Sequence, residues 1–177
     1  MKSLGRAILF GVVFALIFAA GYGAAGFGPH GETAVRYSLD TKQNDHAIIQ
    51  LIDDANQYAY FAVYTFTKTN IADALVRAKR RGVDVQGVTD REQSQTPEEA
   101  AVIQKLRAAG IPVETQKHID GIMHIKALVT DRAYAVGSYN WTWSATNVND
   151  EILEIGNDEN TRGQYLKVIN KVLAENK

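Results

Sequence analysis

The feature that most constrains the fold of this 177-residue chain is a regular alternation of two hydrophobic patterns between residues 34 and 116. Short runs of β-branched and aromatic residues predict strands, whereas apolar residues at every third or fourth position predict helices. The predicted order is a strand at 34–39, a helix at 44–55, a strand at 58–66, a helix at 70–81, a strand at 83–90, a helix at 97–109 and a strand at 111–116. Strands that alternate with helices in this way are typical of parallel crossover units.

The second half of the chain favours shorter connections. Strands are expected at 123–129, 133–136 and 151–155, and the amphipathic segment 160–175 is expected to form a final helix. We therefore predict one α/β domain over residues 29–177, with a mixed, largely parallel β-sheet flanked by helices on both faces. The start of the helix at 97 is the clearest local signal, because Thr96-Pro97-Glu98-Glu99 places a capping threonine before proline and a glutamate where it would complete a capping box.

The N-terminal 28 residues differ from the rest of the chain. Lys2 and Arg6 form a basic start, and residues 7–28 carry no charge. This pattern predicts either a cleaved signal peptide or a retained membrane anchor, with a buried core helix as a third interpretation. Both membrane interpretations predict an exported protein, periplasmic or secreted in the first case and anchored in the inner membrane in the second.

Charge and cysteine content limit the kinds of site that the chain can form. The chain contains no cysteine, so disulfides and thiolate metal sites are excluded. Its formal net charge is −1 at pH 7, whereas many nucleic-acid binders are basic overall. Any anionic substrate must therefore be held by a local group of cations.

Two polar residues in the run 123–129 indicate where that group lies. His124 and Lys126 are two positions apart among strand-forming residues, so we expect their side chains on the same face of a strand. An imidazole beside an ammonium group can attack and bind a phosphate group. Alone, this pair is weak evidence, because partly exposed strands often carry polar residues at such spacing.

Further polar residues follow at defined positions. They are Asp131, then Ser138 and Asn140 within Gly-Ser-x-Asn, and Glu151 in an otherwise apolar predicted strand. The pattern His-x-Lys-x4-Asp followed by Gly-Ser-x-Asn resembles the signature of the phospholipase D superfamily. The short chain, the single motif and the hydrophobic N-terminus resemble the small bacterial endonucleases of that superfamily. This resemblance implies a metal-independent phosphodiesterase that needs no cofactor and acts on DNA or RNA.

The resemblance also implies an assembly and a set of roles. Larger members carry two motifs in one chain, so the single motif implies a homodimer that brings two copies of His124 together. One His124 would attack phosphorus to form a phosphohistidine, and the other, protonated, would donate to the leaving oxygen. Lys126, Ser138 and Asn140 would bind the phosphate oxygens.

The two acidic residues have separate expected roles. Glu151 is the carboxylate that the resemblance implies for orienting the His124 ring. Asp131 is counted with the catalytic residues because it defines the motif. Its position at a strand-to-turn junction nevertheless favours a turn-stabilising or ion-pairing role over a direct phosphate contact.

Two other functions remain open at this stage. The first is a phospholipase D-type hydrolase of phospholipid head groups, and the second is a non-catalytic module that binds nucleic acid or phosphate. Trp141 and Trp143 are expected either in the core or a dimer interface, or stacked on a substrate. The basic run 79–81 is expected to be solvated at a helix end or part of a substrate-facing patch. His118 and Asp120 near His124 match no standard metal-ligand spacing.

Overall fold

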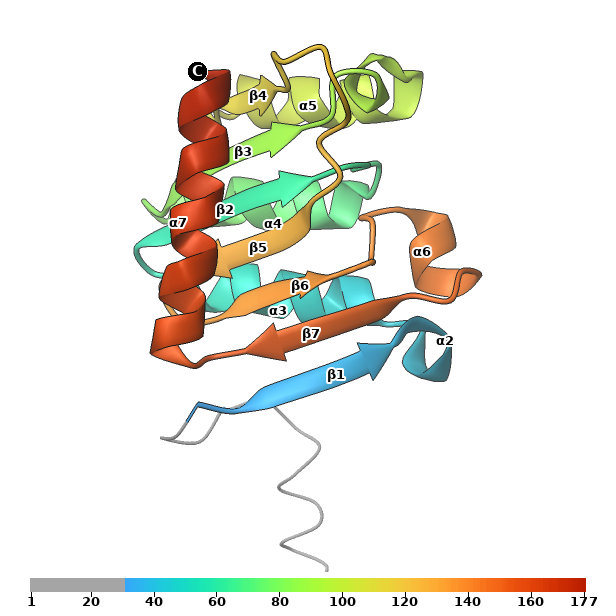
Figure 1. Ribbon diagram of the computed structural model, residues 1–177, viewed down its shortest axis with the longest axis vertical. Helices are drawn as coiled ribbons and strands as arrows, with labels where there is room; N and C mark the ends of the chain where they lie inside the picture. The colour runs from blue at the N-terminus through green and yellow to red at the C-terminus, as the bar shows by residue number, and fades with distance from the viewer. Residues whose placement is uncertain (1–30) are drawn as a thin grey trace, which may run out of the picture. The chain divides into compact units, whose positions relative to one another are not determined.

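The described part of the chain is built on one seven-stranded mixed sheet, with the strand order β1-β7-β6-β5-β2-β3-β4 (Figure 1). The computed structural model describes residues 31–177, and the predicted signal or anchor segment at 1–28 lies outside these residues. The strands are β1 (Thr33–Tyr37), β2 (Tyr58–Val63), β3 (Asp84–Thr89), β4 (Val113–Thr115), β5 (Lys126–Thr130), β6 (Tyr134–Gly137) and β7 (Ile152–Gly156). Each predicted strand is present, with its ends shifted by a few residues.

The pairing of the strands corrects one expectation. The sheet is mixed, as predicted, but it is not largely parallel in its pairing. Among the strands of residues 31–177, only β2–β3 and β3–β4 are parallel pairs, and the other neighbours pair antiparallel. The reason is that β5 and β6 are joined by a short turn, which can connect only antiparallel neighbours, and that β7 and β1 continue this antiparallel half of the sheet.

Helices cover both faces of the sheet, which confirms the predicted layers. Helix α7 crosses one face, and α3, α4 and α5 lie on the other (Figure 1). The helices are α2 (Ser38–Thr41), α3 (Asn44–Asp54), α4 (Thr69–Arg80), α5 (Pro97–Ala108), α6 (Trp143–Asn147) and α7 (Glu159–Asn176), with a 3-10 helix η1 (Gln93–Gln95). Among residues 31–177, none of these helices has the length and hydropathy needed to span a bilayer.

The core is divided between the two faces. On the α7 face, Ile169 and Leu173 pack in one buried cluster with Tyr134 of β6. Elsewhere in the core, the ring of Phe61 on β2 lies directly over Gly87 of β3. A Cβ atom at Gly87 would lie 2.0 Å from that ring, so the side chain of any other residue would displace Phe61. The small residue on β3 thus makes room for an aromatic one on β2.

The start of α5 corrects a second expectation. Pro97 is the first helical residue, as predicted. However, the hydroxyl of Thr96 donates to the carbonyl of Gln93 at 2.8 Å and accepts no helix N–H. Glu99 is buried and accepts the backbone N–H of Phe66 at 2.9 Å. The capping-box prediction is therefore wrong, because a tertiary contact takes the glutamate away from the helix end.

Candidate active site

All of the predicted site residues except Asp131 lie toward one end of the sheet, where β2 and β6 finish and β5 and β7 begin. Lys126 is the first residue of β5 and pairs with Val63, the last residue of β2. Ser138 follows the end of β6, and Glu151 precedes the start of β7. Antiparallel pairing of β5, β6 and β7 thus brings together residues that are far apart in the sequence.

His124 and Lys126 share one neighbour, the ring of Tyr64. His124 is exposed and its ring centroid lies 4.7 Å from that of Tyr64, in an edge-on arrangement. The Nζ atom of Lys126 lies 4.8 Å from the centre of the same ring, a cation–π contact. It also donates to the backbone carbonyl of His124 at 2.9 Å. The strand begins later than predicted, but the two side chains do converge on one aromatic ring.

The environment of Lys126 affects its charge. The residue is only 7% exposed. Burial lowers the pKa of its ammonium group, and the negative charge of Glu151 opposes that shift. Within the described residues Lys126 forms no ion pair, so its charge is available to an incoming anion.

Ser138 and Glu151 are hydrogen-bonded to each other across the β6–β7 pair. The hydroxyl of Ser138 donates to one carboxylate oxygen of Glu151, and the amide of Asn149 donates to the other at 3.2 Å. Gly137 permits this approach, because a Cβ atom there would lie 2.1 Å from the carbonyl oxygen of Ile152. Neither oxygen of Glu151 bonds to the His124 ring of its own chain, so the orienting role of Glu151 stays a prediction.

A buried serine that the sequence analysis missed holds Glu151 in place. Ser38 has no solvent exposure, and its hydroxyl accepts the N–H of Glu151 at 3.0 Å while donating to the carbonyl of Asn149 at 2.6 Å. These bonds tie the segment before β7 to the end of β1. No sequence signal marks this serine, because it belongs to a segment predicted as an ordinary strand.

Asn140 connects the Gly-Ser-x-Asn segment to the turn after β2. Its side-chain oxygen accepts the N–H of Thr65 at 3.2 Å. The next residue, Trp141, forms a parallel bridge with Phe66. The segment that carries Tyr64 is therefore fixed to the segment that carries Asn140.

Asp131 is not brought into this site. It lies at the opposite end of β5, which has five residues, so it is about 16 Å from the start of the strand. Its carboxylate accepts the N–H of Asn56 at 2.9 Å, and its carbonyl accepts from Arg162 at 2.7 Å. Its grouping with the catalytic residues is thus contradicted by its position. The turn-stabilising role that the strand-to-turn junction favoured agrees with these contacts.

The two tryptophans have different environments. Trp141 is 1% exposed and packs edge-on against Phe66 at 4.7 Å and near Phe61 at 5.5 Å. The core interpretation is confirmed for Trp141. Trp143, at the start of α6, is 66% exposed and is free to contact a substrate or a partner.

The remaining candidates lie outside the site or have structural contacts. Arg81 donates to the carbonyls of Ile52 and Ala55 at 2.9 and 3.3 Å, so it stabilises the end of α3. His118 bonds to Gln116 and to the carbonyl of Asp120, and residues 31–177 contain no cluster of acidic, histidine or cysteine side chains arranged to hold a metal.

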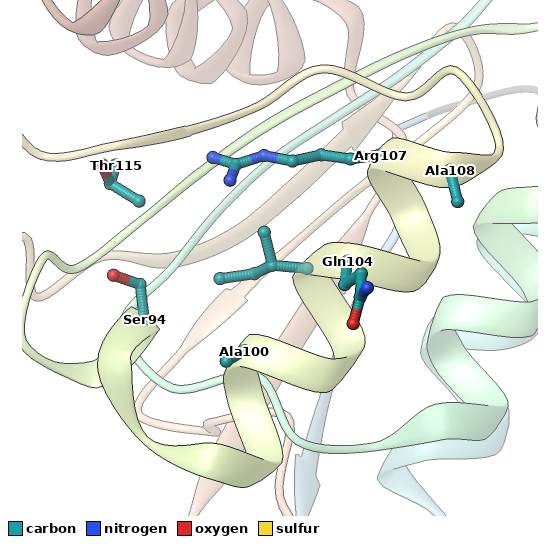
Figure 2. Close-up of a pocket in the computed structure, with 7 residues that line it drawn as sticks. Ser94, Ala100, Gln104, Arg107, Ala108 and Thr115 are labelled. Carbon is teal, nitrogen blue, oxygen red and sulfur yellow. The ribbon is translucent and has the colours of Figure 1, made fainter.

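A hollow of about 370 Å³ lies between η1, α5 and β4, and none of the motif residues lines it (Figure 2). Arg107 extends along it, but this guanidinium donates to the carbonyl of Val113. Gln104 and Thr115 also line the hollow. We assign it no function.

Comparison with known proteins identifies the class of this arrangement. The family model for the cardiolipin synthase, PLD-like domain matches residues 48–173. The described fold is similar to the crystal structure of Nuc from Salmonella typhimurium, a phospholipase D family member, with a TM-score of 0.78, 27% identity and coverage of 84% of this chain and 97% of that one. NucT from Helicobacter pylori shares the fold with a TM-score of 0.77 at 24% identity, covering 82% and 98% of the two chains.

Curated sequences give the same family. A phospholipase D of Rickettsia conorii is 31% identical over 121 residues, which are 68% of this chain and 59% of that protein. A mitochondrial cardiolipin hydrolase of Chlamydomonas reinhardtii is 27% identical over 124 residues, which are 70% and 55% of the two chains. The chain therefore spans less than two thirds of these relatives. Fold and motif together define a PLD-like α/β domain. The chain belongs to the phospholipase D superfamily, as its motif predicted.

Proposed function

We propose that this chain is a metal-independent phosphodiesterase, specifically an endonuclease that hydrolyses nucleic-acid phosphodiester bonds with little sequence preference. The observation that carries the proposal is the exposed imidazole of His124 beside the buried ammonium group of Lys126, both against Tyr64. A solvent-accessible nucleophile next to a partly desolvated cation is the arrangement that attack on an anionic phosphodiester requires.

The reaction proceeds in two displacements. A neutral ring nitrogen of His124 attacks phosphorus and forms a P–N bond, while the P–O bond to the leaving group breaks. His124 of the partner subunit, protonated, donates its proton to the leaving alkoxide. That same imidazole then takes a proton from water, whose oxygen attacks phosphorus and releases the first His124.

Lys126 and its neighbours stabilise the charge that develops on phosphate. Burial lowers the pKa of Lys126 because it removes water from the ammonium group. A bound phosphate replaces that water, so it stabilises the charged form and interacts more strongly with Lys126 than with an exposed lysine. Asn140 and Ser138 lie on the same segment as donors to the non-bridging oxygens: the side-chain NH₂ of Asn140 donates directly, and the hydroxyl of Ser138 turns from Glu151 to the bound phosphate.

Nucleic acid is the substrate that the structural comparison favours. The described fold is similar to that of Nuc, with a TM-score of 0.78 and 27% identity. This similarity agrees with the resemblance of the motif to the small bacterial endonucleases. Because the net charge of the chain is −1, cations near the site must make the contacts with the nucleic-acid phosphates. Salt screens such contacts, so cleavage is expected to weaken as the salt concentration rises.

A substrate panel tests this proposal. Purified protein should cleave DNA or RNA in the presence of EDTA, because no step uses a metal, while releasing no head group from phosphatidylcholine or cardiolipin vesicles. Product sizes on gels and released head group, measured in parallel, give the result. Nucleic-acid binding without cleavage of any substrate would contradict the proposal and favour a non-catalytic binding module.

Phospholipid hydrolysis is the second candidate, and the curated relatives support it. Both are named for lipid hydrolysis, and the matched family model is that of a cardiolipin synthase. Head-group release without nucleic-acid cleavage in the same panel would select this function.

We also propose that the active form is a homodimer. Three exposed apolar residues lie within three positions of site residues: Ile122 before His124, Trp143 after Asn140, and Ile152 after Glu151. We call these three residues the apolar border. Exposed apolar side chains so near in sequence to a site that supplies one histidine per chain favour burial against a second copy.

Charge substitution on this border tests the dimer. Ile152→Glu should shift the protein from dimer to monomer in sedimentation velocity and lower activity by at least about tenfold, because a charge buried in an interface is costly. Val168→Glu is the matched control, since Val168 is 50% exposed on α7 and should leave both properties unchanged. Full activity in a monomeric Ile152→Glu protein would contradict the shared site.

We propose in addition that residues 1–28 export the protein. The uncharged run after Lys2 and Arg6 supports either cleavage, which gives a periplasmic or secreted enzyme, or retention as an inner-membrane anchor. N-terminal sequencing of the mature protein from a fractionated bacterial host separates these outcomes.

A further inference from the structure

One buried carboxyl group lies directly behind the site and takes no part in the proposed chemistry. Glu99, in the first turn of α5, has no solvent exposure. Buried carboxyl groups are rare in protein interiors unless specific hydrogen bonds hold them. The contacts of Glu99 therefore indicate what it does.

Glu99 contacts the segment that carries Tyr64. One of its oxygens accepts the N–H of Phe66 at 2.9 Å, and the other bonds to the hydroxyl of Thr89 at the end of β3. The Thr89 hydroxyl also lies 3.5 Å from the backbone carbonyl of Tyr64. Among residues 31–177 no other group donates to that carbonyl. Glu99 and Thr89 therefore contact the backbone on both sides of Thr65, at the N–H of Phe66 and at the carbonyl of Tyr64. The ring of Tyr64 is the one that contacts His124.

The protonation state of Glu99 decides how these bonds are shared, because a threonine hydroxyl has a single proton to donate. When Glu99 is ionised, Thr89 donates to the carboxylate, and the Tyr64 carbonyl is left without a donor. When Glu99 is protonated, its O–H donates to Thr89, which is then free to donate to Tyr64. The N–H of Phe66 keeps its acceptor in both states.

We propose that the protonated Glu99 side chain, acting through Thr89, positions Tyr64 against His124 and Lys126 and is a positioning residue for the reaction. The inference rests on the proposed phosphodiesterase activity and adds a residue that the motif does not contain. The side chain touches neither His124 nor Lys126, so its effect passes through the backbone of the Tyr64–Phe66 segment.

The surroundings of Glu99 keep the protonated form populated near neutrality. The pKa of Glu99 is raised to about 7, chiefly by burial and further by the negative charge of Asp90, which follows β3, while the hydrogen bonds from Thr89 and Phe66 act in the opposite direction. In the part of the chain that the structure describes, no cation pairs with Glu99. The carboxyl group therefore loses its proton, and the Tyr64 carbonyl loses its donor, as the pH rises through about 7.

Glu99→Gln tests the inference, because a glutamine amide imitates the protonated acid at every pH. Its carbonyl accepts from Phe66 and its NH₂ donates to Thr89. With bis(4-nitrophenyl) phosphate as substrate, the ratio of variant to wild-type kcat should rise at least about fivefold between about pH 6 and about pH 8.5. His124 is present in both proteins, so the ratio isolates the effect of Glu99. A ratio that is constant with pH would overturn the inference.

Two variants of Thr89 test the relay itself. Thr89→Ser keeps the hydroxyl and should keep the wild-type pH profile of kcat. Thr89→Val removes the donor to Tyr64, so it should lower kcat at about pH 6, where Glu99 is protonated, and change it little at about pH 8.5, while abolishing the difference between wild type and Glu99→Gln. If the difference survives in the Thr89→Val background, Thr89 does not carry the effect.

A measurement that needs no activity separates this inference from the proposed function. In NMR titrations of the full chain, the Phe66 amide and the Tyr64 ring should both shift as Glu99 titrates near pH 7, and both shifts should vanish in Glu99→Gln. A Phe66 titration without a Glu99-dependent step at Tyr64 would overturn the inference even in an active enzyme. An inactive protein that shows both steps would contradict the proposed function alone.

Discussion

Replacement of His124 by alanine should reduce phosphodiester hydrolysis by about 10⁴-fold or more, since it removes both the nucleophile and the proton donor of a two-copy site. His124 is exposed, and its ring packs against Tyr64 without a hydrogen bond to any of residues 31–177, so the fold should be retained. Activity in EDTA, measured with the preferred substrate of the panel, gives the loss, and circular dichroism checks the fold.

His46→Ala is the matched control for this substitution. His46 is also exposed, on α3, and lies outside the motif, so its loss should change activity by less than about twofold. If His124→Ala retained activity close to that of the control, the phosphohistidine mechanism would be wrong. Mixing His124→Ala with wild-type chains offers a second check, because heterodimers with one His124 should also be inactive.

Replacement of Trp141 by alanine should lower the free energy of unfolding by about 3–5 kcal/mol, the usual cost of removing a large buried aromatic side chain. Trp141 is 1% exposed and packs against Phe66 and Phe61, so its removal leaves a cavity that its neighbours cannot fill. Urea unfolding followed by circular dichroism measures the change. A loss of binding or activity is expected as well, because Phe66 belongs to the segment that carries Tyr64.

Trp143→Ala is the matched control, since Trp143 is 66% exposed. Its stability, measured at a protein concentration that holds the oligomeric state constant, should change by less than about 0.5 kcal/mol. A small effect at Trp141 with a large one at Trp143 would contradict the assignment of Trp141 to the core.

Much of the fold followed from local patterns. The apolar run at 58–66 contained β2, and the helical spacing at 70–81 and 97–109 contained α4 and α5. Pairing direction did not follow, because hydrophobic periodicity reports which residues are buried and not which strand lies alongside. The turn at Asp131–Arg132 was the one local signal for antiparallel pairing. The crossover pattern of residues 34–116 predicted parallel pairs, but most neighbouring strands of the sheet pair antiparallel.

The sequence by itself determined the chemistry, since the order and spacing of His124, Lys126, Ser138 and Asn140 were sufficient to indicate the superfamily. Only the tertiary structure decided which other residues belong with them. It placed Asp131 at the far end of β5, because a motif defined by spacing along the chain does not report position along a strand.

The tertiary structure also added residues that carry no sequence signal. Tyr64 belongs to a run typical of a buried strand, Ser38 to an ordinary strand, and Glu99 to an apparent capping box. Each acquires its role from a partner between 33 and 113 positions away: Phe66 for Glu99, His124 for Tyr64, and Glu151 for Ser38. Contacts of such long range arise from the packing of sheet and helices, and local patterns in a single sequence do not encode them.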